Sequence, residues 1–102
     1  MSALLEKHRK ELAETCESFG VERLEVFGSE ARGDFEPARS DVDFIVRFRE
    51  PGRPGYADRY LGLAERLEQV LGRPVELLTE RSLRNPFFIR QIGRDRRTVY
   101  GG

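Results

Sequence analysis

Asp41 and Asp43 stand two positions apart at the start of a strand-like apolar stretch that ends at Phe48. Successive side chains of a strand point to opposite faces, so the two aspartates share one face and the apolar residues share the other. Two carboxylates this close repel each other as anions. A hard divalent cation removes that cost, and Mg2+ commonly uses one or two carboxylates together with substrate phosphates. The pair therefore predicts a magnesium site that handles phosphate. The apolar residues on the opposite face are Val42, Phe44, Val46 and Phe48.

Gly28 and Ser29 form a second feature with a chemical meaning, a turn that directly follows the strand-like run 24–27. The backbone N–H groups of such a turn, with Ser29 as the cap of a short helical turn after it, make a concave site for an anion. A polar loop, residues 30–40, separates this turn from Asp41. One end of the loop is thus predicted to bind phosphate, and the other end the metal that accompanies phosphate.

The string GSEARG at 28–33, followed by ARSDVD at 38–43, resembles the minimal nucleotidyltransferase (MNT) subgroup of the DNA polymerase beta-like superfamily. A lone Gly-Ser or Asp-x-Asp is common by chance, whereas the combination at this spacing is specific. The resemblance extends over nearly the whole chain. It implies an α+β fold, in which a small mixed sheet packs against helices, and one domain that spans residues 1–102. The matching positions are Gly28, Ser29, Ala31, Arg32, Gly33, Ala38, Arg39, Ser40, Asp41 and Asp43.

The resemblance also assigns roles to individual residues. It implies one or two Mg2+ ions on Asp41 and Asp43, with ATP as the substrate. The family carries a third carboxylate, usually aspartate, on a later strand, and Glu76 takes that place here. Glutamate is one methylene longer, so Glu76 is expected to act as general base or as metal ligand, with an ordinary surface role as the alternative. The residues expected to bind the nucleotide are Gly28, Ser29, Arg32, Arg39 and Ser40.

Small nucleotidyltransferases of this kind are commonly antitoxins that transfer AMP from ATP to a tyrosine of a HEPN-domain ribonuclease toxin, so the resemblance implies this activity and this partner. Two alternatives stay open. The chain could neutralise its partner by binding alone, which the exchange of aspartate for Glu76 keeps possible. It could instead modify a small molecule such as an antibiotic, although a second domain for that acceptor is missing. A P-loop kinase or ATPase is disfavoured because the chain has no GxxxxGK[ST] motif.

Composition places the chain among soluble, intracellular domains. Its 102 residues fit one domain, and no apolar run approaches the length of a membrane span. The charged N-terminus is not a signal peptide, and the lone Cys16 forms no internal disulfide, so we expect a cytoplasmic protein with Cys16 in the core. Net charge is zero, which argues against a dedicated nucleic-acid binder.

Charge is nevertheless uneven along the chain. Residues 1–50 contain twelve acidic and eight basic residues, whereas residues 51–102 contain six acidic residues and ten arginines. This asymmetry suits an acidic partner or self-association into a homo-oligomer, and a solvated surface is an equally good explanation.

Hydrophobic periodicity and breaker residues predict the remaining elements. The adjacent Phe87 and Phe88 cannot both face one core stripe, so exposure of one of them to a partner or to the nucleotide site is an alternative. Core packing is the default expectation for these phenylalanines. His8 is expected to be a packing residue. A helix that crosses over between two strands of one sheet is the expected arrangement. The predicted elements are helices at 3–19, 58–71 and 80–93 (the last with a broken start at Asn85-Pro86), strands at 21–27, 44–48 and 73–79, a short final strand or tail at 98–100, and a connection at 50–55.

Overall fold

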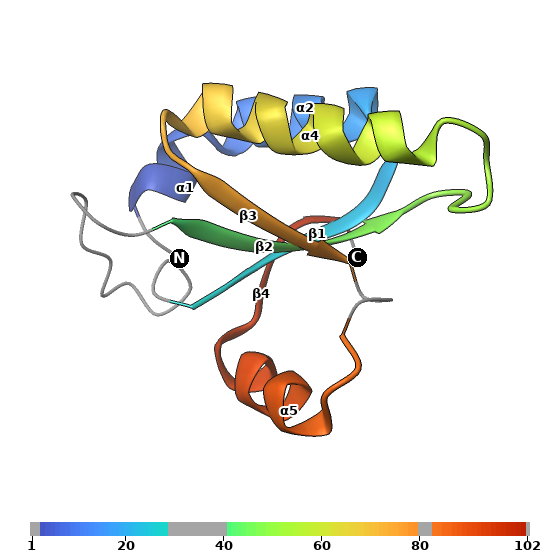
Figure 1. The fold of residues 1–102 in the computed structure, drawn as a ribbon. Helices are drawn as coiled ribbons and strands as arrows, with labels where there is room; N and C mark the ends of the chain where they lie inside the picture. Colours follow the sequence, from blue (N-terminus) through green and yellow to red (C-terminus); the bar gives the residue numbers. More distant parts are fainter. Residues whose placement is uncertain (1–2, 29–40, 80–82, 102) are drawn as a thin grey trace.

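The computed structural model describes residues 3–28, 41–79 and 83–101. Within these ranges, four helices and four strands form a helical layer, a central sheet and one separate helix (Figure 1). In chain order these are α1 (Ala3–Lys7), α2 (Arg9–Ser18), β1 (Val21–Phe27), β2 (Val42–Phe48), α4 (Tyr56–Leu71), β3 (Val75–Thr79), α5 (Pro86–Asp95) and β4 (Arg97–Gly101).

The sheet is mixed and has the strand order β3-β2-β1-β4. β1 pairs antiparallel with both β2 and β4, whereas β2 and β3 are parallel. α4 makes the crossover between the two parallel strands, as expected from the sequence. The predicted small mixed sheet packed against helices is therefore confirmed.

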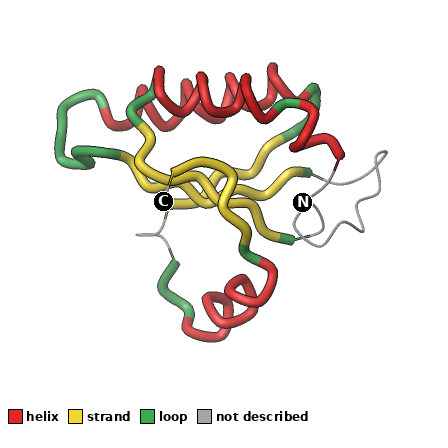
Figure 2. The backbone as a smooth tube through the Cα atoms, turned by 180° about the vertical axis from the view of Figure 1, so that it is seen from behind, coloured by secondary structure: helices red, strands yellow, loops and turns green. Residues whose placement is uncertain are grey.

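Helices cover the two faces of the sheet unequally. α2 and α4 lie side by side across one face, and α5 lies on the opposite side (Figures 1 and 2). The main core fills the space between the helical layer and the sheet, and Cys16 belongs to it as predicted. Its fully buried members include Leu12, Leu24, Phe44, Val46, Leu63 and Leu67.

The sheet face turned away from α2 and α4 carries a smaller apolar cluster. Phe27 and Ile45 are buried there, and Leu78 and Leu83 pack against them. Alternation along β2 explains this division, because Val42, Phe44 and Val46 point into the main core while Asp43 and Ile45 point to the other face. We call this second side the open face of the sheet.

All three predicted helices differ from the structure at one or more boundaries. The predicted helix over residues 3–19 is two helices, because the backbone of His8 (φ −104°, ψ 16°) leaves helical geometry, although hydrogen bonds still run across the break. The predicted helix at 58–71 begins two residues earlier, at Tyr56, with Gly55 as its N-cap at φ 88°. The helix predicted over residues 80–93 is Pro86–Asp95, so residues 83–85 are not helical and the helix ends two residues later than predicted. The predicted cap is confirmed, since Asn85 caps the helix and Pro86 is its first residue.

Among the residues in these three ranges, none belongs to a helix with the length and apolar character needed to span a membrane.

Candidate functional site

Strand register brings three site residues together. Phe27 of β1 pairs with Asp43 of β2, and Asp43 pairs in turn with Glu76 of β3. Gly28 follows Phe27 directly, so the glycine, the aspartate and the glutamate lie across three neighbouring strands at one end of the sheet. The sequence places these residues up to 48 positions apart, and only the sheet pairing makes them neighbours.

Gly28 lies directly against the carboxylate of Asp43. Its φ is 73°, a conformation that glycine adopts without a steric penalty. A β-carbon at this position would stand 2.9 Å from Oδ2 of Asp43, which is closer than such atoms normally approach. The turn therefore needs glycine both for its backbone angle and for the space that the carboxylate occupies.

Asp43 and Glu76 form a pair of interacting carboxyl groups. Burial, a side-chain hydrogen bond with Glu76 and the negative charges of Glu76 and Asp41 raise the pKa of Asp43 from 3.8 to about 6. Such a hydrogen bond between two carboxyl groups requires a proton that they share. A divalent cation can replace that proton and neutralise the same charge, so the donor chemistry fits Mg2+.

Asp41 contributes charge from the residue immediately before β2. Its side chain is exposed, and its charge is one cause of the raised pKa of Asp43. No three carboxylate, thiol or imidazole groups in the described part of the chain already converge as a complete metal centre. The predicted metal site therefore rests on the Asp43–Glu76 pair with Asp41 beside it.

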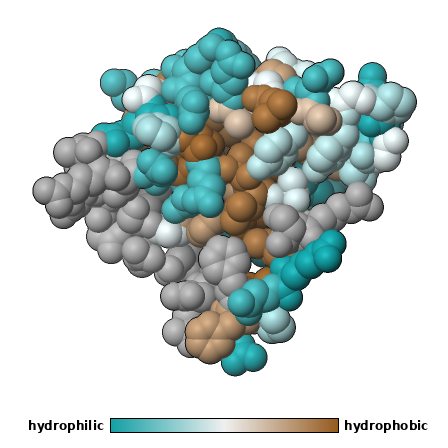
Figure 3. All heavy atoms as spheres, viewed as in Figure 1, coloured by the Kyte–Doolittle hydropathy of each residue, from teal (hydrophilic) through white to brown (hydrophobic). Residues whose placement is uncertain are grey.

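The open face gives this site an apolar floor. Phe27 and Ile45 precede and follow site residues on β1 and β2, and both are buried in the small cluster with Leu78. Figure 3 shows apolar side chains that reach the surface between the helical layer and α5. Asp43 is accordingly half-buried, whereas Glu76, on an edge strand, is exposed. An exposed carboxylate next to a half-buried one can meet an incoming acceptor group.

Tyr60 of α4 contacts the strand that carries Glu76, and nothing in the sequence indicated that Tyr60 belongs near the site. Its hydroxyl donates to the backbone carbonyl of Leu77, the residue after Glu76. Burial and the neighbouring Tyr56 and Glu76 raise the pKa of the Tyr60 hydroxyl. Tyr60 thus ties the edge strand that carries Glu76 to the helical layer.

Four of the predicted nucleotide-binding residues lie outside the described residues: Ser29, Arg32, Arg39 and Ser40. The expected helical turn after Ser29 also lies there. Of the other predicted residues, the structure brings Gly28, Asp43 and Glu76 together. Asp41 is exposed and acts on Asp43 through its charge, but it does not converge with Asp43 and Glu76 into a group of three carboxylates.

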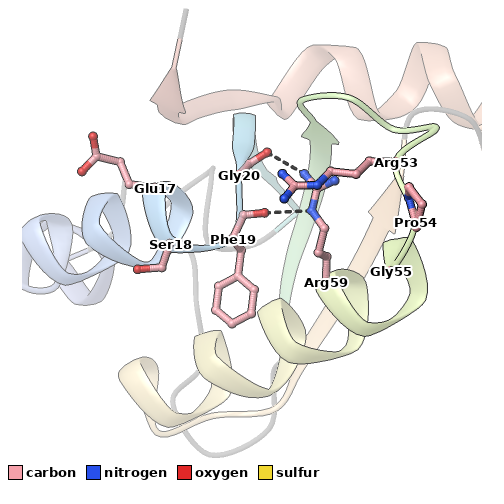
Figure 4. Close-up of a pocket in the computed structure, with 8 residues that line it drawn as sticks. All are labelled: Glu17, Ser18, Phe19, Gly20, Arg53, Pro54, Gly55 and Arg59. Carbon is pink, nitrogen blue, oxygen red and sulfur yellow. Dashed lines mark hydrogen bonds between the residues drawn. The ribbon is translucent and has the colours of Figure 1, made fainter.

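A hollow of about 430 Å³ lies at the other end of β1, lined by residues of α2, α4 and the connection before α4 (Figure 4). The guanidinium group of Arg59 closes one side of it. Arg59 donates to the carbonyl of Phe19 (3.2 Å) and to the carbonyls of Gly20 and Arg49 (2.9 Å each). Its guanidinium carbon also lies 4.8 Å from the centre of the Phe48 ring. Arg59 thus provides hydrogen-bond donors for backbone carbonyls at the end of α2. We interpret the hollow as a structural junction that is remote from the carboxylates.

Comparison with known proteins agrees with the geometry at the carboxylates. The family model of the nucleotidyltransferase domain matches residues 5–99. The chain belongs to the nucleotidyltransferase family. A relative from Methanocaldococcus jannaschii, named as a candidate protein adenylyltransferase, is 38% identical over 92 residues, which are 90% of this chain and 87% of the relative. The protein adenylyltransferase MntA of Thermococcus cleftensis is 39% identical over 85 residues, 83% of this chain and 79% of its own.

Solved nucleotidyltransferase structures show the same fold. A chain described as a minimal nucleotidyltransferase superposes with a TM-score of 0.73 at 34% identity and covers 91% of this nucleotidyltransferase and 90% of itself. The MNT antitoxin in complex with the tri-AMPylated HEPN toxin of Shewanella oneidensis gives a TM-score of 0.65 at 16% identity, over 96% of this chain and 73% of that one. At that identity the second likeness concerns the fold alone.

Proposed function

We propose that this nucleotidyltransferase transfers AMP from ATP to a tyrosine hydroxyl of a HEPN-domain ribonuclease toxin and acts as the antitoxin of that toxin. The observation that carries the proposal is the meeting of Gly28, Asp43 and Glu76 across three adjacent strands. Support for a protein acceptor comes from relatives at 38% and 39% identity that are named as protein adenylyltransferases. ATP and such a toxin would place the reaction in the cytoplasm.

The reaction forms one bond and breaks one bond. The acceptor hydroxyl oxygen bonds to the α-phosphorus of ATP, the bond from that phosphorus to the oxygen bridging to the β-phosphate breaks, and pyrophosphate leaves. Asp41, Asp43 and Glu76 would hold one or two Mg2+ ions. Bound magnesium supplies neutralisation of the triphosphate charge and alignment of the attacking and leaving oxygens. No covalent intermediate on the protein is needed.

In the alternative in which Asp41 and Asp43 hold the metal alone, Glu76 is the best-placed group to accept the hydroxyl proton. It is exposed on an edge strand, whereas Asp43 is half-buried beside Gly28. A base must come within hydrogen-bonding distance of the proton that it takes, and an exposed carboxylate is open to a partner protein. Gly28 and the turn residue Ser29 would bind the triphosphate, and Arg32, Arg39 and Ser40 complete the proposed nucleotide site.

The decisive experiment mixes the purified chain with α-labelled ATP, Mg2+ and a HEPN-domain protein from the same organism. Label on a tyrosine of the partner, found by mass spectrometry, supports the proposal. Loss of ribonuclease activity without label would instead assign neutralisation by binding alone. Label on an added aminoglycoside, but not on the partner, would assign a small-molecule transferase.

A further inference from the structure

Both ends of α5 are attached to the open face of the sheet. Before the helix, Leu83 packs against Phe27 and Ile45. After it, Nη2 of Arg96 lies 2.7 Å from Oε1 of Glu25, a carboxylate buried on β1. A charge-assisted contact of this length in a buried setting holds its two partners firmly. α5 therefore has a defined place on the side of the sheet that carries Asp43 (Figures 1 and 2).

α5 is also formed in advance of any partner. Oδ1 of Asn85 accepts a hydrogen bond of 2.9 Å from the backbone N–H of Phe87, and Pro86 occupies the first helical position. Both features favour a helix start at this point. A binding element that is already ordered loses less entropy when a partner docks.

One side of this ordered helix exposes a large apolar side chain, since Phe87 is 76% exposed. Ile89, which is 39% exposed, stands two positions further on and therefore faces a different side of the helix. Arg84 and Arg90 are exposed as well, and Arg90, three positions after Phe87, lies on the same side of the helix. Residues 83–101 contain five arginines and one aspartate. In Figure 3, an apolar side chain lies next to hydrophilic ones at the foot of the molecule, where Figure 1 places α5.

The direction from which an acceptor protein can reach the carboxylates indicates which partner would contact α5. α2 and α4 cover one face of the sheet, so Asp43 and Glu76 are accessible from the face on which α5 lies and from the free edge of β3. An acceptor protein that approaches on that face lies beside α5. A partner whose surface is apolar with an acidic rim would bury Phe87 and pair with the arginines.

We propose that α5 is the docking element for the acceptor protein, with Phe87 as its apolar anchor and Arg84 and Arg90 as the basic rim. The matching surface on the partner is an apolar patch edged by aspartate and glutamate. This inference rests on the proposed function, because it assumes that the acceptor is a protein. It adds to that function by naming the surface that selects the partner.

The test measures the dissociation constant for a purified HEPN-domain protein from the same organism, by calorimetry, for three forms of the chain. Phe87→Ala is expected to weaken binding at least tenfold. Leu61→Ala is the matched control, because Leu61 is 64% exposed on α4, in the helical layer on the other side of the sheet. We expect it to bind within twofold of wild type. The affinity for ATP should be the same in all three forms.

The basic rim is tested separately with Arg84→Glu combined with Arg90→Glu. This variant should weaken binding to the partner and reduce the salt dependence of binding, because two attractive charges become repulsive. Unchanged affinity and salt dependence would overturn the assignment of the rim.

Several outcomes would overturn the proposal: wild-type affinity in Phe87→Ala, no binding by the wild-type chain, or loss of self-association in Phe87→Ala while partner binding is unchanged. The last result would assign the surface to a second copy of the chain. Tight binding that depends on Phe87, without transfer of AMP, would support the docking surface and contradict the proposed enzymatic function instead.

Discussion

Gly28 lies so close to Asp43 that a β-carbon on the glycine would stand 2.9 Å from Oδ2 of the aspartate. The glycine belongs to the turn expected to bind phosphate, and the aspartate belongs to the pair expected to bind metal. Their proximity joins the two halves of the proposed site, so a change at either residue should disturb both halves.

Gly28→Ala should impair activity more than its effect on stability explains. Alanine at φ 73° costs about 1–2 kcal/mol, and its β-carbon also displaces the carboxylate of Asp43. Gly72→Ala is the matched control, since Gly72 has φ 67° and a β-carbon there would have no neighbouring atom within 4 Å. Both variants should lose similar stability in thermal melts, whereas only Gly28→Ala should lose most of its AMP transfer. Equal activity in the two variants would contradict the close contact.

Asp43→Asn should stabilise the metal-free protein near neutral pH. The pKa of Asp43 is raised to about 6 in the folded state, so the folded chain binds this proton more tightly than the unfolded chain does. The contribution of Asp43 to stability is therefore present below about pH 4 and is lost as the pH rises through about 6. Thermal melts in EDTA should show a higher Tm for the variant at pH 7.5, and the difference should shrink towards pH 4. A lower Tm for the variant at pH 7.5 would contradict the raised pKa.

Glu25→Gln should destabilise the fold by about 1–3 kcal/mol, because it removes the charge that Arg23 and Arg96 approach in a buried setting. Glu22→Gln is the control on the same strand. Glu22 lies 3.6 Å from Arg47, but both side chains are about half exposed, so the change should stay within about 0.5 kcal/mol. Urea unfolding at neutral pH distinguishes the two. Equal losses would show that burial of Glu25 has no energetic consequence.

Arg59→Lys should lower stability by about 1–3 kcal/mol without lowering the transfer rate of the folded protein. Lysine cannot reproduce the forked set of hydrogen bonds to the carbonyls of Phe19, Gly20 and Arg49. Arg66→Lys is the control, since Arg66 is exposed and bonds only to Gln69 among the described residues. Urea unfolding and the AMP-transfer assay together check both variants. Loss of transfer in folded Arg59→Lys would mean that the hollow of Figure 4 belongs to the functional site.

Sequence patterns predicted most of the fold because apolar periodicity and Gly and Pro residues mark where its elements begin and end. The strand Val21–Phe27 and the cap Asn85–Pro86 follow from local rules that tertiary contacts did not override. The break at His8 was missed, because Leu5 and Leu12 keep one apolar stripe running through it. The earlier start of α4 was missed because glycine at an N-cap position lacks the side-chain signal of serine or aspartate.

Contacts between distant residues of the site could be predicted only in part. The motif placed Gly28, Asp41 and Asp43 together, and the family resemblance added Glu76. Long-range contacts had no such signal, because no local spacing encodes how the helices pack on the sheet. The long-range contacts that the sequence did not predict are the hydrogen bond from Tyr60 to the backbone of β3, the ion pair Glu25–Arg96 and the contacts of Arg59 with backbone carbonyls.

The exposure of Phe87 was one of the alternatives for the phenylalanine pair, and the structure decides in its favour. Periodicity alone could not choose, because either phenylalanine of the pair satisfies the apolar stripe of α5 equally well.

Nucleotidyl transfer should depend on the carboxylates beside the Gly28 turn. The sharpest test measures transfer of labelled AMP from ATP to the HEPN-domain partner by Asp43→Asn, with Mg2+ and with partner binding verified in the same samples. We expect the rate to fall by at least about 100-fold while partner binding is retained. Transfer at close to the wild-type rate would show that these carboxylates do not carry out the reaction.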